Sequence, residues 1–203
     1  MELTQERVIP KKMNPNNGML LEHIERYRFS KAFAKGEVLD IACGAGYGAE
    51  ILLENNDQMV SYTGADIDEE CIRYAREQYG SAQTRFLQCN ALDQDLPRKL
   101  GKYDTIVSFE TIEHFHGDQQ FIENLYQMLK PGGILLISTP FGRGVGKPCK
   151  NPYHVHQYTE EEFVDRLGKF SDVTMYHQVG QDIERPKADK KYYLMVALCK
   201  KKA

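Results

Sequence analysis

Apolar residues along the chain follow two patterns that alternate. Short apolar runs of strand length are separated by segments in which apolar residues recur every three or four positions, the period of an amphipathic helix. The apolar runs predict strands over residues 38–41, 60–65, 84–89, 103–109 and 134–138. The segments of helical period predict helices over residues 19–34, 48–56, 69–79 and 118–130. This alternation predicts right-handed crossovers and a mostly parallel sheet with helices on both faces.

The segment after the fifth predicted strand breaks this alternation. Residues 140–158 are rich in Gly and Pro and predict a loop. Thr159 stands three positions before Glu162, which is the spacing of a capping box. We therefore expect a sixth helix that begins at this Thr and ends at about Leu167.

The C-terminal region predicts two strands with no helix between them. These strands cover residues 173–179 and 192–199, and their connection, residues 181–190, is so polar that we expect a loop and an antiparallel hairpin. The fold class is therefore α/β, a doubly wound sheet of seven strands that is mostly parallel, with an antiparallel last strand. We expect residues 1–203 to form a single domain around this sheet.

The composition fits a globular chain and argues against a membrane or secreted protein. The 203 residues are 41% hydrophobic and 27% charged, ordinary values for a soluble domain. The longest uncharged apolar run, residues 132–141, is far shorter than the ~20 residues that span a bilayer. Residues 1–7 show no basic start followed by an apolar run, so we expect no secretory signal.

Charge and cysteine content narrow the classes of partner and the compartment. The 26 Lys and Arg residues against 29 Asp and Glu residues leave a net charge of −3, with no basic excess to bind nucleic acid or acidic lipid. The five cysteines are odd in number and never form a Cys-x-x-Cys pair. We therefore expect reduced thiols and a cytoplasmic location.

A glycine-rich turn after the first predicted strand is the main chemical signal. Residues 44–49 (GAGYGA) match the Gly-x-Gly-x-x-Gly/Ala fingerprint of dinucleotide sites, and Asp66 closes the second strand where a ribose-binding acid is expected. Asp40, four residues before the turn, would repel a pyrophosphate but attract a positively charged ligand. At ~4 Å and an effective dielectric of ~20, one charge pair is worth about 4 kcal/mol before desolvation. The positive sulfonium and ammonium of S-adenosylmethionine are thereby favoured, although an Asp that only caps the turn would serve either cofactor.

Five segments in order resemble the motifs of class I S-adenosylmethionine-dependent methyltransferases. The resemblance covers about residues 20–140, and the N-terminal segments 6–10 and 22–27 are similar to small, stand-alone bacterial members. It implies a Rossmann-like, doubly wound sheet and S-adenosylmethionine as cofactor, with S-adenosylhomocysteine as product. The matching segments are residues 38–48 (VLDIACGAGYG), 64–68 (GADID), 86–92 (FLQCNAL), 103–114 (YDTIVSFETIEH) and 129–133 (LKPGG).

The resemblance implies a role for each matching position. Asp66 would bind both ribose hydroxyls, and Ile67 would lie against the adenine. Asn90 stands where the family usually has Asp, and its amide oxygen can accept the same hydrogen bond from the adenine amino group without a charge. The methionine end would be held by Asp40, Ala42, Gly44 and Gly46.

Four further positions complete the predicted cofactor site. Ala91, with its backbone amide, and Leu92 belong to the segment that contacts adenine, and Glu110 would lie near the sulfonium. Tyr27 would close over the cofactor from the N-terminal helix, and a plain packing role is the alternative for this residue.

Two histidines are the candidate catalytic groups. An oxygen or nitrogen acceptor loses a proton during methyl transfer, so a base with a pKa near neutrality assists the reaction. His154 lies in the loop after the fifth strand, where substrates of this fold usually enter, and is our first candidate. His114, which lies beside the cofactor motifs together with Glu113, is the second.

A metal site is not expected from the sequence. The pairs His114-x-His116 and His154-x-His156 could join as metal ligands, but no neighbouring Asp or Cys pattern identifies a third ligand.

The motifs favour a cytoplasmic methyltransferase that acts on the O or N of a small molecule, such as a sugar or secondary metabolite. Its parts would be an N-terminal cap segment and helix (1–36), a cofactor-binding core (37–140) and an acceptor-side loop with the terminal hairpin (141–203). We expect a monomer or homodimer with no nucleic-acid or membrane partner. The alternatives are a non-catalytic S-adenosylmethionine-binding module and an NAD-dependent oxidoreductase, which would need a Tyr-x-x-x-Lys motif or a second domain that the sequence does not offer.

Overall fold

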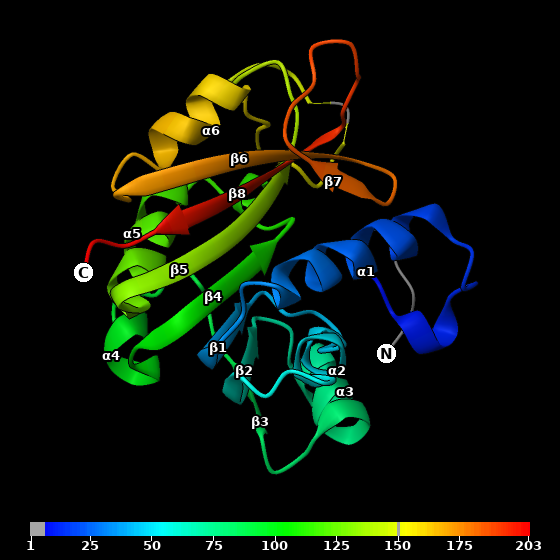
Figure 1. Cartoon of the computed structure of the whole chain (residues 1–203), viewed down its shortest axis with the longest axis vertical. Helices are drawn as coiled ribbons and strands as arrows, with labels where there is room; N and C mark the ends of the chain where they lie inside the picture. The colour runs from blue at the N-terminus through cyan, green and yellow to red at the C-terminus, as the bar shows by residue number, and fades with distance from the viewer. Residues whose placement is uncertain (1–6, 150) are drawn as a thin grey trace.

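The computed structural model describes residues 7–149 and 151–203. The strands form one sheet in the order β3-β2-β1-β4-β5-β8-β6-β7 (Figure 1). Neighbouring strands from β3 to β5 run parallel, whereas β8 is antiparallel to both β5 and β6, and β7 is antiparallel to β6. The strands are β1 (Gly36–Ile41), β2 (Met59–Asp66), β3 (Thr84–Gln88), β4 (Tyr103–Phe109), β5 (Leu129–Pro140), β6 (Asp172–Val179), β7 (Asp182–Glu184) and β8 (Leu194–Lys200).

Helices cover both faces of the sheet. The α-helices are α1 (Gly18–Lys31), α2 (Gly48–Leu53), α3 (Glu69–Tyr79), α4 (Leu96–Leu100), α5 (Asp118–Met128) and α6 (Glu160–Arg166). The helices α1, α2 and α3 contribute to one hydrophobic cluster, while α4, α5 and α6 contribute to a second (Figure 1). Two short 3₁₀ helices cover Pro10–Lys12 and Ile112–His114.

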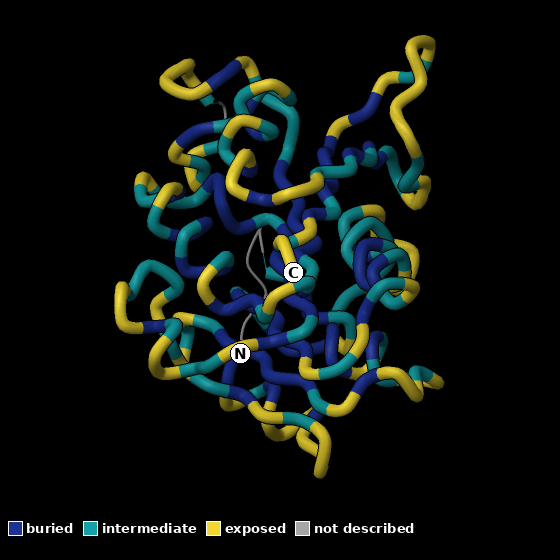
Figure 2. Tube along the Cα trace, turned by 60° about the vertical axis from the view of Figure 1, so that its left-hand side comes forward, coloured by how far each residue is buried: buried dark blue, intermediate teal, exposed yellow. Residues whose placement is uncertain are grey.

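The apolar runs are buried on both sides because consecutive strand residues point to opposite faces of the sheet. In β1, Val38 packs in the cluster with α1 to α3, and Leu39 packs in the opposite cluster with α4 to α6. In β4, Val107 and Ile106 divide between the two clusters in the same way. Buried segments run through the centre of the trace and exposed ones lie mainly at its turns (Figure 2). The prediction of a doubly wound α/β sheet is thus confirmed.

The strand count departs from the prediction. The sheet has eight strands rather than seven, because residues 182–184 in the connection predicted as a loop form β7. This strand pairs with β6 through Ile183 opposite Gln178, and edge pairing relies on backbone groups, so it needs no apolar run to reveal it. The predicted antiparallel pairing of the last two long strands is correct, since β6 and β8 are neighbours.

Several helix boundaries also differ from the prediction. The helix α2 ends at Leu53, short of the predicted residue 56, and Asn55 just beyond it has a positive φ of 49°. The helix α5 ends at Met128, because β5 begins at Leu129, two residues before Pro131. The short helix α4 was not predicted. The capping box that opens α6 is confirmed, with both reciprocal hydrogen bonds between Thr159 and Glu162 present. Among the described residues, no helix is both long and apolar enough to cross a bilayer.

The strand order places a reversal at β1. The chain adds β2 and β3 on one side of β1 and then returns to add β4 and β5 on the other side. In open parallel sheets, ligands bind at such a switch point, beyond the carboxyl ends of the strands. The residues that follow β1, β2 and β4 therefore define the place to look for a site.

Candidate functional site

A cavity of about 430 Å³ lies at this switch point. Its walls come from the turn after β1, the end of β2, the exit of β4, the helix α1 and the loop after β5. Seven of the residues predicted from sequence line it, namely Tyr27, Ala42, Gly44, Asp66, Glu110, His114 and His154. Asp40, Gly46, Ile67, Asn90, Ala91 and Leu92 are not among its lining residues.

The turn after β1 brings its backbone to the cavity through a run of positive φ angles. Ala42 has a φ of 63°, Gly44 of 53° and Gly46 of 79°, in the left-handed region that L side chains rarely adopt. The amides of Ala42 and Cys43 both donate to the carbonyl oxygen of Ala65, at 2.7 and 3.1 Å, and so tie the turn to β2. The backbone of the turn is therefore held in place rather than free to follow a ligand.

The glycines of this turn serve two different purposes. A Cβ at Gly44 would meet no atom within 4 Å, so the space above this residue belongs to the cavity. A Cβ at Gly46 would lie 2.5 Å from the Cβ of Ala75, and one at Gly48 would lie 2.3 Å from the ring of Tyr27. Gly44 thus leaves room for a ligand, whereas Gly46 and Gly48 allow α2 to pack closely against its neighbours.

Asp40 lies behind the turn, fully buried. One of its carboxylate oxygens accepts hydrogen bonds from the hydroxyls of Tyr27, at 2.9 Å, and Tyr62, at 2.5 Å. Its other oxygen, Oδ1, has no hydrogen-bond partner among the described residues. Burial raises the pKa of Asp40 to about 7, and the two tyrosine hydroxyls oppose that rise. The charge that the sequence assigns to this residue is thus only partly present at neutral pH, and a cation nearby would increase it.

Asp66 stands at the end of β2 and lines the cavity. Its Oδ2 accepts from the amide of Gly44 at 2.8 Å, and its Oδ1 accepts from the amide of Asp68 at 2.9 Å. Burial raises the pKa of Asp66, and these backbone hydrogen bonds act in the opposite direction. The carboxylate is therefore fixed in orientation at the point where the β1 turn and the β2 end meet.

The residues predicted to contact adenine lie outside the cavity walls. Ile67 is 65% exposed, an unusual value for an apolar side chain that directly follows a buried strand. The side-chain oxygen of Asn90 accepts from the amide of Leu92 at 2.9 Å, and the carbonyl of Ala91 accepts from Asn124 Nδ2 at 2.8 Å. Ile67 directly follows Asp66 at the end of β2, while Asn90 and Ala91 come just after the end of β3, the strand that pairs with β2. All three therefore lie near the strand end that carries Asp66.

Two carboxyl groups lie beyond β4. Glu110 has a positive φ of 50°, and its Oε1 accepts from the hydroxyl of Ser138 at 3.0 Å. Glu113 is 0% exposed, and its Oε2 accepts from the hydroxyl of Thr139 at 3.0 Å, while its Oε1 has no hydrogen-bond partner in the described part of the chain. Burial raises the pKa of both groups, and the charge of Glu110 raises the pKa of Glu113 further.

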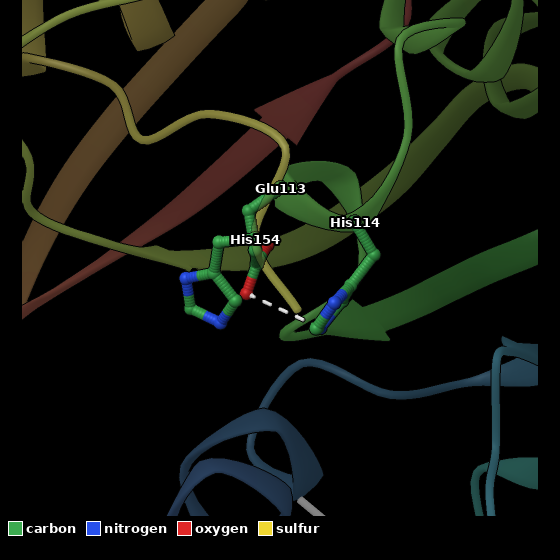
Figure 3. A group of neighbouring side chains, drawn as sticks. All are labelled: Glu113, His114 and His154. Atoms are coloured by element: carbon green, nitrogen blue, oxygen red, sulfur yellow. Dashed lines mark ion pairs between the residues drawn. The ribbon is translucent and has the colours of Figure 1, made fainter. Parts of the chain in front are cut away.

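The structure brings His114 and His154 together. Their ring centroids lie 4.9 Å apart at an interplanar angle of 89°, and the carboxylate of Glu113 points between the two rings (Figure 3). His114 Nδ1 lies 3.0 Å from the carbonyl oxygen of Tyr153, and the ring nitrogens of His154 lie near the amides of Asn151, at 2.9 Å, and Gln157, at 3.4 Å. Both predicted catalytic histidines therefore face the same side of the cavity.

The remaining histidines with described contacts take part in other interactions. His156 and Tyr158 form a buried hydrogen bond, His177 pairs with Glu160, and His23 Nδ1 lies 3.3 Å from the hydroxyl of Tyr47. Among these, His23 also lines the cavity.

Sequence reasoning did not identify every cavity residue. Arg26 and Glu22 project into the cavity from α1, and Asn151 does so from the loop after β5. Arg26 is 1% exposed, and its Nη1 donates to Gln178 Oε1 at 2.8 Å. A buried arginine on a helix of mixed polarity leaves no periodic signal, because the pattern of apolar positions cannot show which polar residue turns inward.

Comparison with known proteins shows that the core is similar to methyltransferase domains. A family profile described as "Methyltransferase domain" matches residues 39–135, which contain the β1 turn, Asp66 and the exit of β4. A "probable S-adenosylmethionine-dependent methyltransferase" from Mycolicibacterium smegmatis is 29% identical over 171 residues, which is 82% of this chain and 63% of that protein. The chain therefore spans less than two thirds of that relative's length.

Two further proteins similar to this chain are also methyltransferases by name. The ubiquinone biosynthesis O-methyltransferase of Rickettsia canadensis is 35% identical over 107 residues, 52% of this chain and 43% of that protein. The crystal structure of the N-methyltransferase NodS from Bradyrhizobium japonicum superposes with a TM-score of 0.68 at 20% identity, covering 94% of this chain and all of the other. At that level of identity the superposition shows a shared fold.

Proposed function

We propose that the chain is a class I S-adenosylmethionine-dependent methyltransferase that transfers a methyl group to the oxygen or nitrogen of a small-molecule acceptor, a proposal that the similarity to methyltransferase domains supports. The observation that carries this proposal is a single cavity with two differently built sides. One side consists of the glycine turn and Asp66, and the other consists of Glu110, His114 and His154.

The residues of the first side fit the cofactor. Gly44 leaves open space above a rigid backbone, and the buried Oδ1 of Asp40 lacks a partner among the described residues. An unsatisfied buried carboxylate oxygen behind the turn that lines the cavity favours a ligand that brings positive charge to that turn. When bound, S-adenosylmethionine supplies a methyl group already activated by its sulfonium.

Each residue on this side has a definable task. The backbone of Ala42 and Gly44 would bind the methionine end, together with the charge of Asp40 behind it. Asp66 would accept hydrogen bonds from the ribose hydroxyls, and Ile67, whose exposure leaves its side chain available, would cover the adenine. On the adenine side, Asn90, Ala91 and Leu92 would contact the base only if it extends past the cavity. Gly46, predicted at the methionine end, would act through packing.

Tyr27 and Glu110 would lie where the two sides of the cavity meet. The ring of Tyr27 packs edge-on against Tyr47 and Phe109, at centroid distances of 5.2 and 5.0 Å, so its hydroxyl is held toward Asp40. This geometry combines the packing role with a wall of the cofactor site. Glu110 would contribute negative charge near the sulfonium.

The second side would position the acceptor and remove its proton. Methyl transfer mostly requires alignment of the acceptor atom and exclusion of water, since the methyl carbon is already reactive. His154 would take the acceptor's proton at a ring nitrogen, and His114 Nε2 is the alternative base. Both groups line the cavity, which is the geometric requirement for a base.

A compact acceptor is supported by the walls of the cavity. Residues of α1, together with Asn151 and His154, contribute to the walls of this cavity of about 430 Å³, a size that favours a sugar or a secondary metabolite over a polymer. The curated and structural relatives named above comprise an O-methyltransferase and an N-methyltransferase, which supports either acceptor atom. A cytoplasmic monomer or homodimer without nucleic acid remains our proposal, and the five cysteines, none in a disulfide, are consistent with that compartment.

A turnover assay tests the proposal. The full chain is incubated with S-adenosylmethionine and a panel of hydroxylated and amino metabolites, and the release of S-adenosylhomocysteine is measured. We expect release that depends on at least one class of acceptor and is lost in Asp66→Ala but kept in Asp172→Ala, a carboxylate removed from an exposed position on β6. Tight cofactor binding without release on any acceptor would instead indicate a binding module.

A further inference from the structure

Glu113, His114 and His154 form a cluster that the methyl-transfer proposal does not fully use. Each residue offers one ligand atom, and these three atoms lie within 4.8 Å of one another (Figure 3). We propose that the three side chains bind a divalent transition-metal ion on the acceptor side of the cavity. The ion would hold and activate the acceptor, a role that rests on the proposed function, whereas the binding of the ion itself does not.

The three ligands are held by a backbone frame. Glu113 and His114 belong to the 3₁₀ helix after β4, and His154 belongs to the loop after β5. The amide of Val155 donates to the carbonyl of Glu113 at 2.9 Å and so ties the loop to the 3₁₀ helix. His114 Nδ1 lies 3.0 Å from the carbonyl of Tyr153, a second link between the same segments. The ligands are therefore close together before any ion binds.

The electrostatics of the cluster favour a cation. Glu113 is completely buried and its Oε1 has no hydrogen bond within the described chain, although His114 Nε2 lies 4.0 Å from it. A second carboxyl, that of the half-buried Glu110, adds repulsion, and the positive charge of Arg26 offsets only part of it. Burying a carboxylate without a partner is costly, and a divalent ion would satisfy the free oxygen directly.

The donor set indicates the class of metal. Two imidazoles and one carboxylate suit Zn²⁺, Fe²⁺ or Co²⁺, whereas Mg²⁺ and Ca²⁺ prefer oxygen ligands throughout. Metal-bound histidines usually direct their other ring nitrogen to a carbonyl or carboxylate. His114 Nδ1 already faces the Tyr153 carbonyl, and its Nε2 lies on the side of Glu113, 4.0 Å from Oε1. Thr139 supports Glu113 in the same manner through its other oxygen.

Binding requires a modest rearrangement. Ligand atoms lie ~2.0–2.2 Å from a zinc ion, so two of them on one ion are roughly 3–4 Å apart. The three atoms would move together from their present spacing, and His154 would exchange its contact with Asn151 or with Gln157 for the ion. Both contacts are side-chain amides on a loop, which can rotate without disturbing the sheet.

The ion would face the acceptor. His114 and His154 line the cavity, and three protein ligands leave a coordination position open. An acceptor hydroxyl in that position would have a lowered pKa and would release its proton to water. Its oxygen would then form the C–O bond as the C–S bond breaks, with the electron pair kept on sulfur. His114 and His154 would thus act as ligands rather than as the base.

The sequence does not indicate this site, because the histidines that come together are not the closely spaced pairs His114-x-His116 and His154-x-His156. His114 and His154 come together from separate segments, while the neighbouring His156 is buried against Tyr158. The third ligand is Glu113, directly adjacent to His114, for which no spacing pattern in the sequence gives a signal.

Titration with Co²⁺ tests the site without relying on activity. The full chain, first treated with a chelator, is titrated while visible absorption of the bound ion is recorded, and Zn²⁺ is then added as a competitor. We expect saturable absorption that Zn²⁺ displaces. Glu113→Gln, His114→Gln and His154→Gln should each weaken Co²⁺ binding at least tenfold, whereas His116→Gln, a histidine exposed on the loop after the 3₁₀ helix, should leave it unchanged.

The affinity for S-adenosylhomocysteine, measured on the same samples, shows whether the variants keep a folded cofactor site. Absence of Co²⁺ binding, or binding unaffected by all three variants, with S-adenosylhomocysteine still bound, would overturn the metal site while leaving the proposed function standing. If the unaltered protein did not bind S-adenosylhomocysteine, that result would count against the proposed function instead. Turnover that survives chelation unchanged would overturn the role of the ion in holding the acceptor.

Discussion

The two sides of the cavity are built in different ways. The donor side, which is the side with the glycine turn and Asp66, is made of backbone turns at the ends of β1 and β2. Its parts lie within residues 40–68. The acceptor side joins the exit of β4 to a loop some forty residues later and to α1 at the other end of the chain. A site made from one continuous segment leaves a motif in the sequence, whereas a site assembled from distant loops does not. The sequence therefore indicates the cofactor that this protein uses but not its acceptor.

The largest expected effect concerns the stability contributed by Asp40. Its pKa is raised from 3.8 to about 7, so the folded chain binds more protons than the unfolded chain between these values. The carboxyl therefore contributes stability that is fully present below about pH 4 and is lost as the pH rises through 7, up to about 4 kcal/mol in total. Urea denaturation between pH 4 and 7.5 should show that Asp40→Asn removes this part of the pH dependence.

Asp104 provides the control for that measurement. Lys130 holds the pKa of Asp104 below its usual value, so its stabilisation is lost only as the pH falls below about 4. Between pH 4.5 and 7.5, the free energy of unfolding of Asp104→Asn should change with pH as steeply as that of the unaltered protein. If Asp40→Asn kept that slope as well, the carboxyl would not be buried as described.

The next effect separates the two sides by kinetics. His154→Gln removes a group from the acceptor side alone. Turnover should fall by about 100-fold or more, because the variant loses either a proton-transfer group or a ligand of the ion that activates the acceptor. The dissociation constant for S-adenosylhomocysteine, measured by calorimetry, should stay within about twofold. A large loss of cofactor affinity in this variant would show that the two sides are not separate, and His116→Gln should alter neither quantity.

A donor-side carboxylate should give the converse result. Asp66→Ala removes an acceptor of hydrogen bonds from the cofactor, and hydrogen bonds to charged groups contribute about 1.5–3 kcal/mol. We expect S-adenosylhomocysteine to bind roughly 10- to 100-fold more weakly, with Asp172→Ala as the unchanged control. Unaltered affinity in Asp66→Ala would remove Asp66 from the cofactor site.

The smallest effect compares two glycines with nearly the same φ. Gly44 has a φ of 53° and Gly180 of 56°, and a Cβ on either would meet no atom within 4 Å. Substitution by Ala should cost each site a similar ~1–2 kcal/mol of unfolding free energy. Only Gly44→Ala should also weaken the binding of S-adenosylhomocysteine, by about tenfold, because only its Cβ would enter the cavity. Equal affinities in the two variants would show that the cofactor does not approach this backbone.

Sequence was sufficient for most of the sheet and for the donor side. The strands β1, β2, β4 and β5 each contain consecutive buried residues, so their apolar runs are unambiguous, and the turn at Gly44 with Asp66 follows directly from them. It was insufficient where structure depends on pairing or on inward-turning polar groups. Ile183 forms an edge strand through backbone bonds, and Arg26 and Glu113 are buried by tertiary packing that no local pattern encodes.

The adenine contact of Asn90 stays a prediction. The segment around it resembles an adenine contact, and in the structure its side chain is exposed and its oxygen accepts from the amide of Leu92. A motif places a residue at the right strand end, whereas the direction of its side chain depends on the loop that follows.

A crystal structure of the full chain with S-adenosylhomocysteine bears on all of these points at once. We predict that the sulfur atom lies in the cavity between the turn at Gly44 and the pair His114 and His154, with the ribose against Asp66. Such a position would put the donor on one side and leave the other open to an acceptor. A ligand bound outside this cavity, or a sulfur atom turned away from both histidines, would refute the division of the site proposed here.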